Sequence, residues 1–341
     1  MLGRAPINKD MLPVSDPLSI PAPLAEKSVM LIAPKRIGWG FLQLPGVRLP
    51  FSDTYRKGLF VFLLVTAVAC FWEPLTDLYS LTKQQEHYSH IILIPWLSVY
   101  AFYMDRSKIL SSKEWSPILG LCLMSAAAVV AWRIDHSTLG ADTLSAQILA
   151  FVVACWGAFL LCFGASASRT FFFGLLFLLW MIPLPTALLS AVIVFLQRAS
   201  AEATDVVFTL LGIPFYRDGF IFTLPNLSIH IAEECSGIRS TLSLIITSLV
   251  AGHFFLRSAW TKVTLVLIVI PLAIVKNAFR IVALSLLANY IDRTFITDSV
   301  LHRSGGIPLF VLSLVVLGLL TLLLKGLEKR SGSSDALPAR V

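Results

Sequence analysis

The sequence contains few charged residues for its length. Only 14% of the 341 residues are Asp, Glu, Lys or Arg, 57% are hydrophobic, and the mean hydropathy is +0.81. Because a water-soluble domain carries about 25% charged residues, this composition excludes a soluble globular protein and predicts a polytopic membrane protein. The net charge of +7 comes from cations near the ends of apolar runs, where membrane topology explains them. We therefore expect no nucleic-acid partner.

Cysteine is also scarce, and no two cysteines have disulfide or metal-site spacing. Four of the five lie inside apolar runs, namely Cys70, Cys122, Cys155 and Cys162. These four are predicted to be small buried hydrophobic residues. The fifth, Cys235, follows two glutamates and precedes Ser-Gly at the edge of a polar segment. Its setting distinguishes it from the others.

The beginning of the chain has no long apolar segment. Residues 1–57 are rich in proline and contain eight Lys or Arg against four Asp or Glu, which is typical of a largely disordered basic tail. The first apolar run starts at Gly58, so we expect a membrane anchor there and no cleavable signal peptide. We predict a cytoplasmic tail over 1–57, a membrane domain over 58–325 and a second cytoplasmic tail over 326–341.

Eight apolar runs approach the length that a helix needs to cross about 30 Å of hydrocarbon. They predict an all-α integral membrane protein with about eight transmembrane helices. The runs cover 58–72, 88–104, 116–132, 143–164, 170–189, 238–256, 263–288 and 305–324. With the N-terminus inside, 18 Lys or Arg fall in inner segments and six in outer segments. This asymmetry favours cytoplasmic placement of both termini.

One extramembrane segment, residues 190–237, is longer than a turn, and this topology places it in the periplasm. Its first half predicts either an amphipathic helix along the membrane surface or an outward extension of the fifth span. Its second half alternates apolar runs with turns at 217–219 and 225–226, which predicts a small β-hairpin or meander. That insertion leads the chain directly into Cys235.

The position of Cys235 favours a reactive thiol. Ser236 and Gly237 follow it, and the apolar run from Ile238 begins a helix. Free backbone N–H groups and the positive end of the helix dipole both favour a thiolate over a thiol. Gly237 permits close backbone approach, and the N–H groups there would also receive the oxyanion formed when a thiolate attacks a carbonyl. A structural cysteine in a loop is the alternative interpretation.

Two further polar groups are predicted on the same side of the membrane. Lys276, Asn277 and Arg280 interrupt an apolar helix, and about seventeen residues at 1.5 Å each place Arg280 about 25 Å across the bilayer from Lys262. Intramembrane cations usually line a cavity or bind an anion, although they also extend to the lipid headgroups. His302 precedes the last span and would supply the acid or base that a thiol nucleophile needs.

Other polar residues near these positions are weaker candidates. Arg239, four residues after Cys235, would pair with a neighbouring glutamate or help to hold the thiolate. His230 ends the third predicted strand and is a competing base. His87 and His90 have the spacing of a metal-ligand pair, but no third ligand is evident, so an interfacial position is preferred.

These residues resemble a known motif set. The string Glu234–Ser240, the Asn-Ala-Phe-Arg string at 277–280 and the later His302 are similar to the exosortase branch of the exosortase/archaeosortase family. The resemblance extends from about Tyr88 to the eighth span. Archaeal relatives use arginine in place of the histidine, so His302 indicates the bacterial branch.

The resemblance implies a bacterial inner-membrane cysteine transpeptidase that processes C-terminal sorting signals of the PEP-CTERM kind at the periplasmic face. Carried over residue by residue, it makes Cys235 the nucleophile, with Arg280 and His302 as its catalytic partners. Ser236, Gly237, Arg239 and Asn277 would support them. The partners would be a substrate's transmembrane sorting signal, membrane lipid, and an acceptor amine or water. No metal or organic cofactor is required.

Two other functions fit parts of the sequence. A transporter or channel for an anionic solute would bind the solute with Lys276 and Arg280. Internal symmetry between the two halves of the chain would favour this function. The sequence shows no such symmetry, because the large outer insertion occurs only once. A non-catalytic factor for polysaccharide export would form no covalent adduct on its thiol. Replacement of Cys235 distinguishes both from the enzyme.

Overall fold

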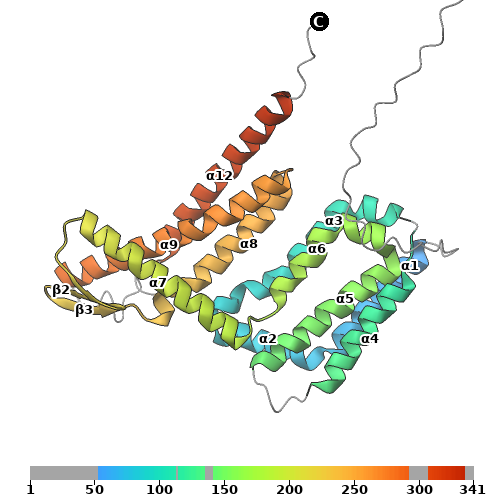
Figure 1. Ribbon diagram of the computed structural model, residues 1–341. Coiled ribbons are helices and arrows are strands. Elements are labelled where there is room, and N and C mark those ends of the chain that lie inside the picture. The colour runs from blue at the N-terminus through green and yellow to red at the C-terminus, as the bar shows by residue number, and fades with distance from the viewer. Residues whose placement is uncertain (1–52, 113, 135–140, 292–305, 335–341) are drawn as a thin grey trace, which may run out of the picture. The chain divides into compact units, whose positions relative to one another are not determined.

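The computed structural model describes residues 53–112, 114–134, 141–291 and 306–334. Helices dominate these residues, and a three-stranded sheet lies between α7 and η3 along the chain (Figure 1). The elements are α1 (Asp53–Cys70), α2 (Trp72–Gln84), η1 (Glu86–Leu93), α3 (Ile94–Ser111), α4 (Pro117–Arg133), α5 (Ala141–Thr170), α6 (Phe172–Phe177), η2 (Leu178–Met181), α7 (Thr186–Leu210), β1 (Tyr216–Asp218), β2 (Ile221–Leu224), β3 (Leu227–His230), η3 (Glu233–Ser236), α8 (Ile238–Phe255), α9 (Ala259–Tyr290) and α12 (Gly306–Ser334).

Five of these helices are long and apolar enough to cross a membrane: α5, α7, α8, α9 and α12. The number is six if α1 and α2, which are bent by 70° at their junction, form one broken span. These findings support a multi-pass membrane protein. They do not establish the eight spans that the apolar runs predict.

The difference has local causes in three of the runs. The helix α3 contains three charged residues in its second half, Asp105, Arg106 and Lys108, and α4 has only 17 residues. The run over 170–189 is broken, because α6 and η2 end at Met181 and α7 begins at Thr186. Prolines remove backbone donors and favour extended backbone before them, and the break contains Pro183 and Pro185.

The segment expected to be a periplasmic insertion therefore starts inside α7. The 25-residue helix α7 is separated from the helical segment that ends at Met181. It is therefore a separate helix and not an outward extension of that segment. Asp142 stabilises its start, because its carboxylate accepts hydrogen bonds from Thr186 N at 2.7 Å and from Thr186 Oγ1 at 3.0 Å. After α7, the strands form an antiparallel sheet in the order β1-β2-β3. The first strand, β1, includes Arg217 and Asp218, for which the sequence predicts a turn.

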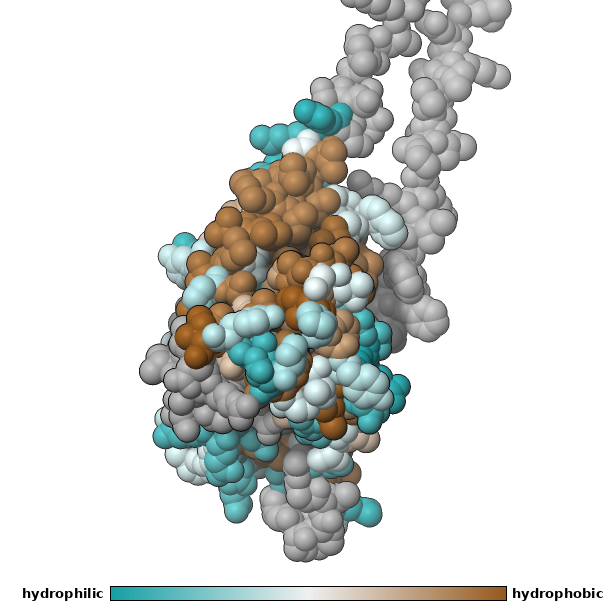
Figure 2. Space-filling view, turned by 90° about the vertical axis from the view of Figure 1, so that its left-hand side faces the viewer, coloured by the Kyte–Doolittle hydropathy of each residue, from teal (hydrophilic) through white to brown (hydrophobic). Residues whose placement is uncertain are grey.

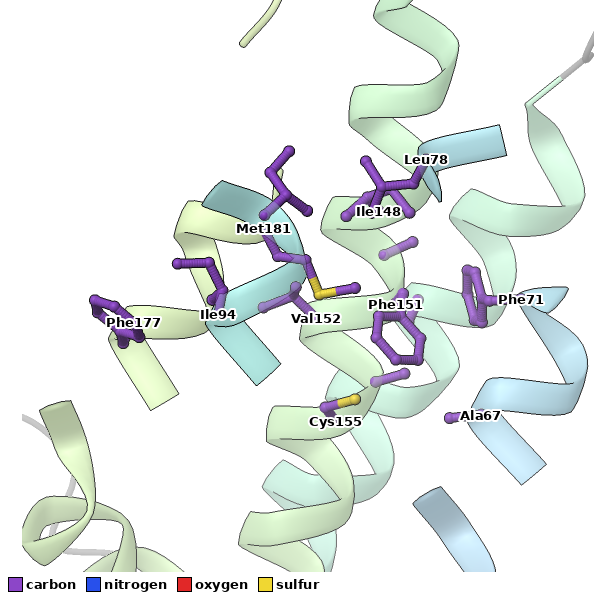
Figure 3. Packing of buried hydrophobic residues seen from close by; sticks show 14 of the residues in the cluster. Ala67, Phe71, Leu78, Ile94, Ile148, Phe151, Val152, Cys155, Phe177 and Met181 are labelled. Carbon is purple, nitrogen blue, oxygen red and sulfur yellow. The ribbon is translucent and has the colours of Figure 1, made fainter. Parts of the chain in front are cut away.

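The largest apolar cluster is formed by the elements before α7 together with Ile246 of α8. In Figure 3, Phe71 and Phe151 lie edge to face, with ring centroids 5.8 Å apart. Buried Cys155 belongs to this cluster and buried Cys162 to a second one. Cys70 and Cys122 are exposed, which corrects the prediction that all four cysteines are buried. A small hydrophobic residue on a helix that contacts lipid needs no protein neighbour.

Apolar side chains also cover a large part of the surface. Along α12 they include Val311, Val315, Leu319 and Leu322, each more than half exposed. Figure 2 shows one face of the protein on which hydrophobic residues form a broad continuous area beside a region of mixed hydrophilic residues. Such a surface is expected of helices in contact with lipid. Residues 326–334, predicted to belong to a tail, continue α12 as helix.

Candidate functional site

Cys235 lies in η3, immediately before α8. The short helix η3 ends at Ser236, and α8 begins at Ile238, so the cysteine precedes a helix start as the sequence predicts. Between them Gly237 has a left-handed backbone with φ of +75°. Glycine adopts this conformation without the steric penalty that other residues incur. The chain therefore turns sharply at Gly237 and brings Cys235 close to the first turn of α8.

The side chain of Asn277 connects the cysteine segment to two helices. Its amide Nδ2 donates one hydrogen bond of 2.7 Å to the carbonyl oxygen of Cys235 and another of 3.0 Å to Ser200 Oγ. Asn277 and Ser200 are fully buried, in α9 and α7 respectively. Burial strengthens the requirement that such polar groups are paired. This one amide thus holds η3, α7 and α9 together.

Asn277 also explains why position 237 has no side chain. A Cβ atom added to Gly237 would lie 2.8 Å from Cγ and 2.8 Å from Oδ1 of Asn277. Two hydrogen bonds restrain that amide, so it has little freedom to move away. Its Oδ1 has no hydrogen-bond partner among the described residues, nor has the buried hydroxyl of Ser236.

A second polar contact joins α9 to the start of α8. The ammonium group of Lys276 donates a hydrogen bond to Ser240 Oγ, and Ser240 Oγ donates to the carbonyl oxygen of Gly237 at 3.0 Å. Thr241 donates to the same oxygen from both its backbone N and its Oγ1, at 3.0 and 2.9 Å. Lys276 and Asn277 are thus consecutive residues that bind the two sides of the segment around Gly237.

The side chain of Cys235 is half-buried and packs against an apolar cluster. The buried members come from α7, the sheet, the residue after the sheet and α9: Ala201, Phe208, Phe222, Leu224, Ile231, Ile281 and Val282. Ile229 of β3 packs against the same cluster, whereas His230 is exposed. Successive side chains of a strand point to opposite faces of the sheet. His230 therefore points away from the cluster that contacts Cys235, which argues against it as the base.

Arg239 has a partner from a distant part of the chain. Its Nη1 lies 2.5 Å from Oε2 of Glu86 in η1, in an ion pair whose side chains are both exposed. The sequence suggested a pairing with a glutamate adjacent to Cys235. The observed contact instead links the first turn of α8 to η1, which also packs against α8.

The other two predicted catalytic residues differ in how far the structure describes them. Arg280 is partly buried in α9, three residues after Asn277. Residues three apart in an α-helix lie on the same side, so Arg280 is carried on the side of α9 that contacts η3. His302 lies outside the described residues. The proximity of thiol, guanidinium and imidazole therefore remains a prediction.

His87 and His90 are both in η1. One ring nitrogen, Nδ1 of His90, lies 2.9 Å from the carbonyl oxygen of His87. Burial lowers the pKa of the His87 imidazole, and burial is also the main cause of the lowered pKa of His90. Across the described ranges, no three His, Cys, Asp or Glu residues are arranged to hold a metal ion.

Several contacts of the site were not predictable from the sequence. In the sequence, Ser200 and Gln197 have the pattern of ordinary polar residues of an amphipathic helix, yet both are buried. Gln197 Nε2 donates a 2.5 Å hydrogen bond to the carbonyl oxygen of Ile231, shortly before Cys235. A polar residue on the apolar side of α7 was the only available signal. It does not reveal which segment the side chain contacts.

These features define a polytopic membrane protein with a half-buried cysteine at the start of an apolar helix and two cationic residues on the neighbouring helix. The chain belongs to the transmembrane exosortase family, because the family model described as transmembrane exosortase (Exosortase_EpsH) matches residues 82–319. The matched range includes Cys235, Asn277, Arg280 and His302. Comparison with curated proteins and with solved structures gives no match. Family membership supports a membrane transpeptidase of the cysteine type whose substrates carry C-terminal sorting signals.

Proposed function

We propose that this protein cleaves the C-terminal sorting signals of exported proteins at the periplasmic face of a bacterial inner membrane. The signal, of the PEP-CTERM kind, consists of a short motif, a transmembrane helix and a basic end. The substrate helix packs laterally among the spans, in contact with membrane lipid, and presents the motif to Cys235. Both termini of the enzyme lie in the cytoplasm.

The proposed reaction has two stages. The Cys235 thiolate attacks the scissile carbonyl carbon, and a guanidinium N–H of Arg280 stabilises the resulting oxyanion. The C–N bond then breaks, His302 gives a proton to the leaving amine, and a thioester remains on Cys235. An acceptor amine or water attacks the thioester and loses a proton to His302. The thiolate is regenerated, and the steps use no metal or organic cofactor.

The observation that most supports this proposal is the hydrogen bond from Asn277 to the carbonyl oxygen of Cys235. It fixes the cysteine segment against α9 one helical turn from Arg280. The burial of Asn277 and Ser200 makes this connection rigid, and catalytic groups need such support from surrounding residues to keep a productive geometry.

The decisive experiment replaces the nucleophile in the full-length protein. Cys235→Ala is co-expressed with a tagged exported protein that carries a C-terminal sorting signal, and processing is followed by the change in substrate size. Loss of a nucleophile that acts in a coupled set is expected to reduce the rate by about 10³-fold or more. The matched control is Cys122→Ala, another free cysteine, which should process at the normal rate. Normal processing by Cys235→Ala would contradict the proposal.

The proposed partners are tested in the same assay. Arg280→Lys keeps the positive charge but loses the planar set of donors, so a large loss of rate is expected if the guanidinium binds the oxyanion. His302→Ala should also abolish turnover. Mass spectrometry of the protein after incubation with a substrate peptide should detect an acyl adduct on Cys235, which an anion transporter or an assembly factor would not form.

A further inference from the structure

Lys276 is a cationic residue buried within a transmembrane helix. It is only 7% exposed, and among the described residues its one hydrogen-bond partner is the neutral hydroxyl of Ser240. No carboxylate whose side chain the structure describes, a set that does not include Glu234, lies within ion-pair distance of its ammonium group. Burial of an ammonium ion without a counter-charge is strongly unfavourable. A source of negative charge near this position would therefore stabilise the ammonium form of Lys276.

Hydrogen bonds connect Lys276 to the segment that contains Cys235. From Lys276 they run through Ser240 to the carbonyl oxygen of Gly237, two residues after Cys235. The next residue of α9, Asn277, binds the carbonyl oxygen of Cys235 itself. The ammonium group and the cysteine segment are thus held against the same turn of α9, where Lys276 and Asn277 are both buried.

The acidic side chains that the structure describes near the site have other partners or are exposed. Glu202 and Asp205 of α7 both bind Arg217, Glu86 binds Arg239, and Glu233 is exposed. The titratable and charged residues of the elements around Cys235 are Arg198, Glu202 and Asp205 of α7, Tyr216, Arg217 and Asp218 of β1, His230 of β3, Glu233 and Glu234 of η3, Arg239 and His253 of α8, and Lys262, Lys276, Arg280 and Tyr290 of α9.

We propose that Lys276 is a positioning residue whose buried ammonium group serves as the counter-charge of the Cys235 thiolate. The proposal rests on the assignment of Cys235 as the nucleophile and adds a residue that acts on its ionisation. Opposite charges interact over a longer range in a membrane interior than in water, so direct contact with the sulphur is not needed. Lys276 thereby increases the fraction of Cys235 that is ionised at neutral pH.

Alkylation of Cys235 measures this effect without any substrate. The full-length protein in membranes is treated with iodoacetamide across a range of pH, and modification of the Cys235 peptide is quantified by mass spectrometry. Only the thiolate reacts with iodoacetamide. Lys276→Gln and Lys276→Met should therefore slow alkylation near neutral pH by about tenfold, which corresponds to a tenfold smaller fraction of ionised Cys235. At strongly alkaline pH all variants should react equally. Lys276→Arg, which keeps the cation, should retain the wild-type profile.

Two comparisons separate charge from structure. Gln at position 276 keeps a donor for Ser240, so a wild-type profile for Lys276→Gln would mean that only the hydrogen bond matters and would overturn the proposal. Equal slowing at every pH would indicate altered access and would also overturn it. Lys262→Gln, the same change near the other end of α9, should have no effect.

Ser240→Ala provides a test that keeps the lysine. This variant retains the cation but removes the hydrogen bond that fixes its position. We expect an alkylation rate near neutral pH between those of the wild type and Lys276→Gln. An unchanged pH profile of alkylation would count against the proposal. The processing assay of Cys235→Ala separates the two hypotheses. If processing persists there while Lys276→Gln shifts the alkylation profile, the enzyme assignment fails and the electrostatic inference stands. If Cys235→Ala abolishes processing while Lys276→Gln leaves the alkylation profile unchanged, the enzyme assignment stands and the electrostatic inference fails.

Discussion

The carbonyl oxygen of Cys235 accepts a 2.7 Å hydrogen bond from the buried amide of Asn277, 42 residues later in the chain. The same amide binds Ser200 of α7, so three segments depend on one side chain. This relationship places the cysteine between helices that are distant in sequence. Substitutions at Asn277 and Gly237 should therefore affect activity and stability to different degrees.

Asn277→Ala should impair processing more than it impairs folding. The change removes both hydrogen bonds and leaves the Cys235 carbonyl unrestrained against α9, and loss of such a supporting contact typically reduces activity by about 10- to 100-fold. Asn289→Ala is the matched control, because Asn289 is a buried residue of the same helix whose Oδ1 accepts a hydrogen bond from the backbone N of Asn226 in the turn between β2 and β3. Equal processing by the two variants would contradict the prediction.

Gly237→Ala should destabilise the protein for two physical reasons. An alanine at φ of +75° is strained, and its Cβ would lie 2.8 Å from the restrained amide of Asn277. Gly212→Ala separates the two effects, because Gly212 also has positive φ, of +66°, but a Cβ there would meet nothing within 4 Å. We expect a cost of roughly 1–2 kcal/mol at Gly212 from the backbone alone and a larger cost at Gly237. Thermal unfolding in detergent measures both, and equal shifts would exclude the steric contribution.

The two histidines of η1 should make the protein less stable in acid. Burial lowers their pKa in the folded state below the ordinary value of 6.5. Below that value the unfolded chain binds protons that the folded protein does not, so stability declines as pH falls from 6.5 toward the folded-state pKa. Above 6.5 the histidines should contribute no pH dependence.

A double variant, His87→Gln with His90→Gln, provides the measurement for this prediction. Its unfolding temperature should vary less between mildly acidic and neutral pH than that of the wild type. The comparison removes the contribution of carboxylates, which titrate in both proteins. An identical acid dependence would show that η1 does not resist protonation.

The ion pair between Arg239 and Glu86 should support the position of η1. Because both side chains are exposed, its direct contribution to stability should be about 0.2–1 kcal/mol and should decrease with added salt. A double-mutant cycle with Arg239→Gln and Glu86→Gln isolates this coupling. If Arg239 acts only through Glu86, both single variants should reduce processing equally. A larger loss for Arg239→Gln would indicate a separate role near the thiolate.

The sequence predicts the helical parts of this fold well because hydropathy and helix length are local properties. Each apolar run corresponds to helix over most of its length, and the break before α7 coincides with Pro183 and Pro185. The number of spans is less predictable. Whether a marginal helix such as α4 or the bent pair α1 and α2 crosses the membrane depends on packing that hydropathy does not describe.

For the site, local pattern was sufficient to identify a cysteine before a helix start, a glycine at a sharp turn and an intramembrane polar string. Those features depend on residues close together in the chain. The bonds from Asn277 to Ser200 and Cys235, from Lys276 to Ser240 and from Arg239 to Glu86 join residues 36 to 153 positions apart. Such contacts depend on how each helix is rotated and which neighbour it packs against. These choices are made by close packing of whole helices, and no short stretch of sequence records them.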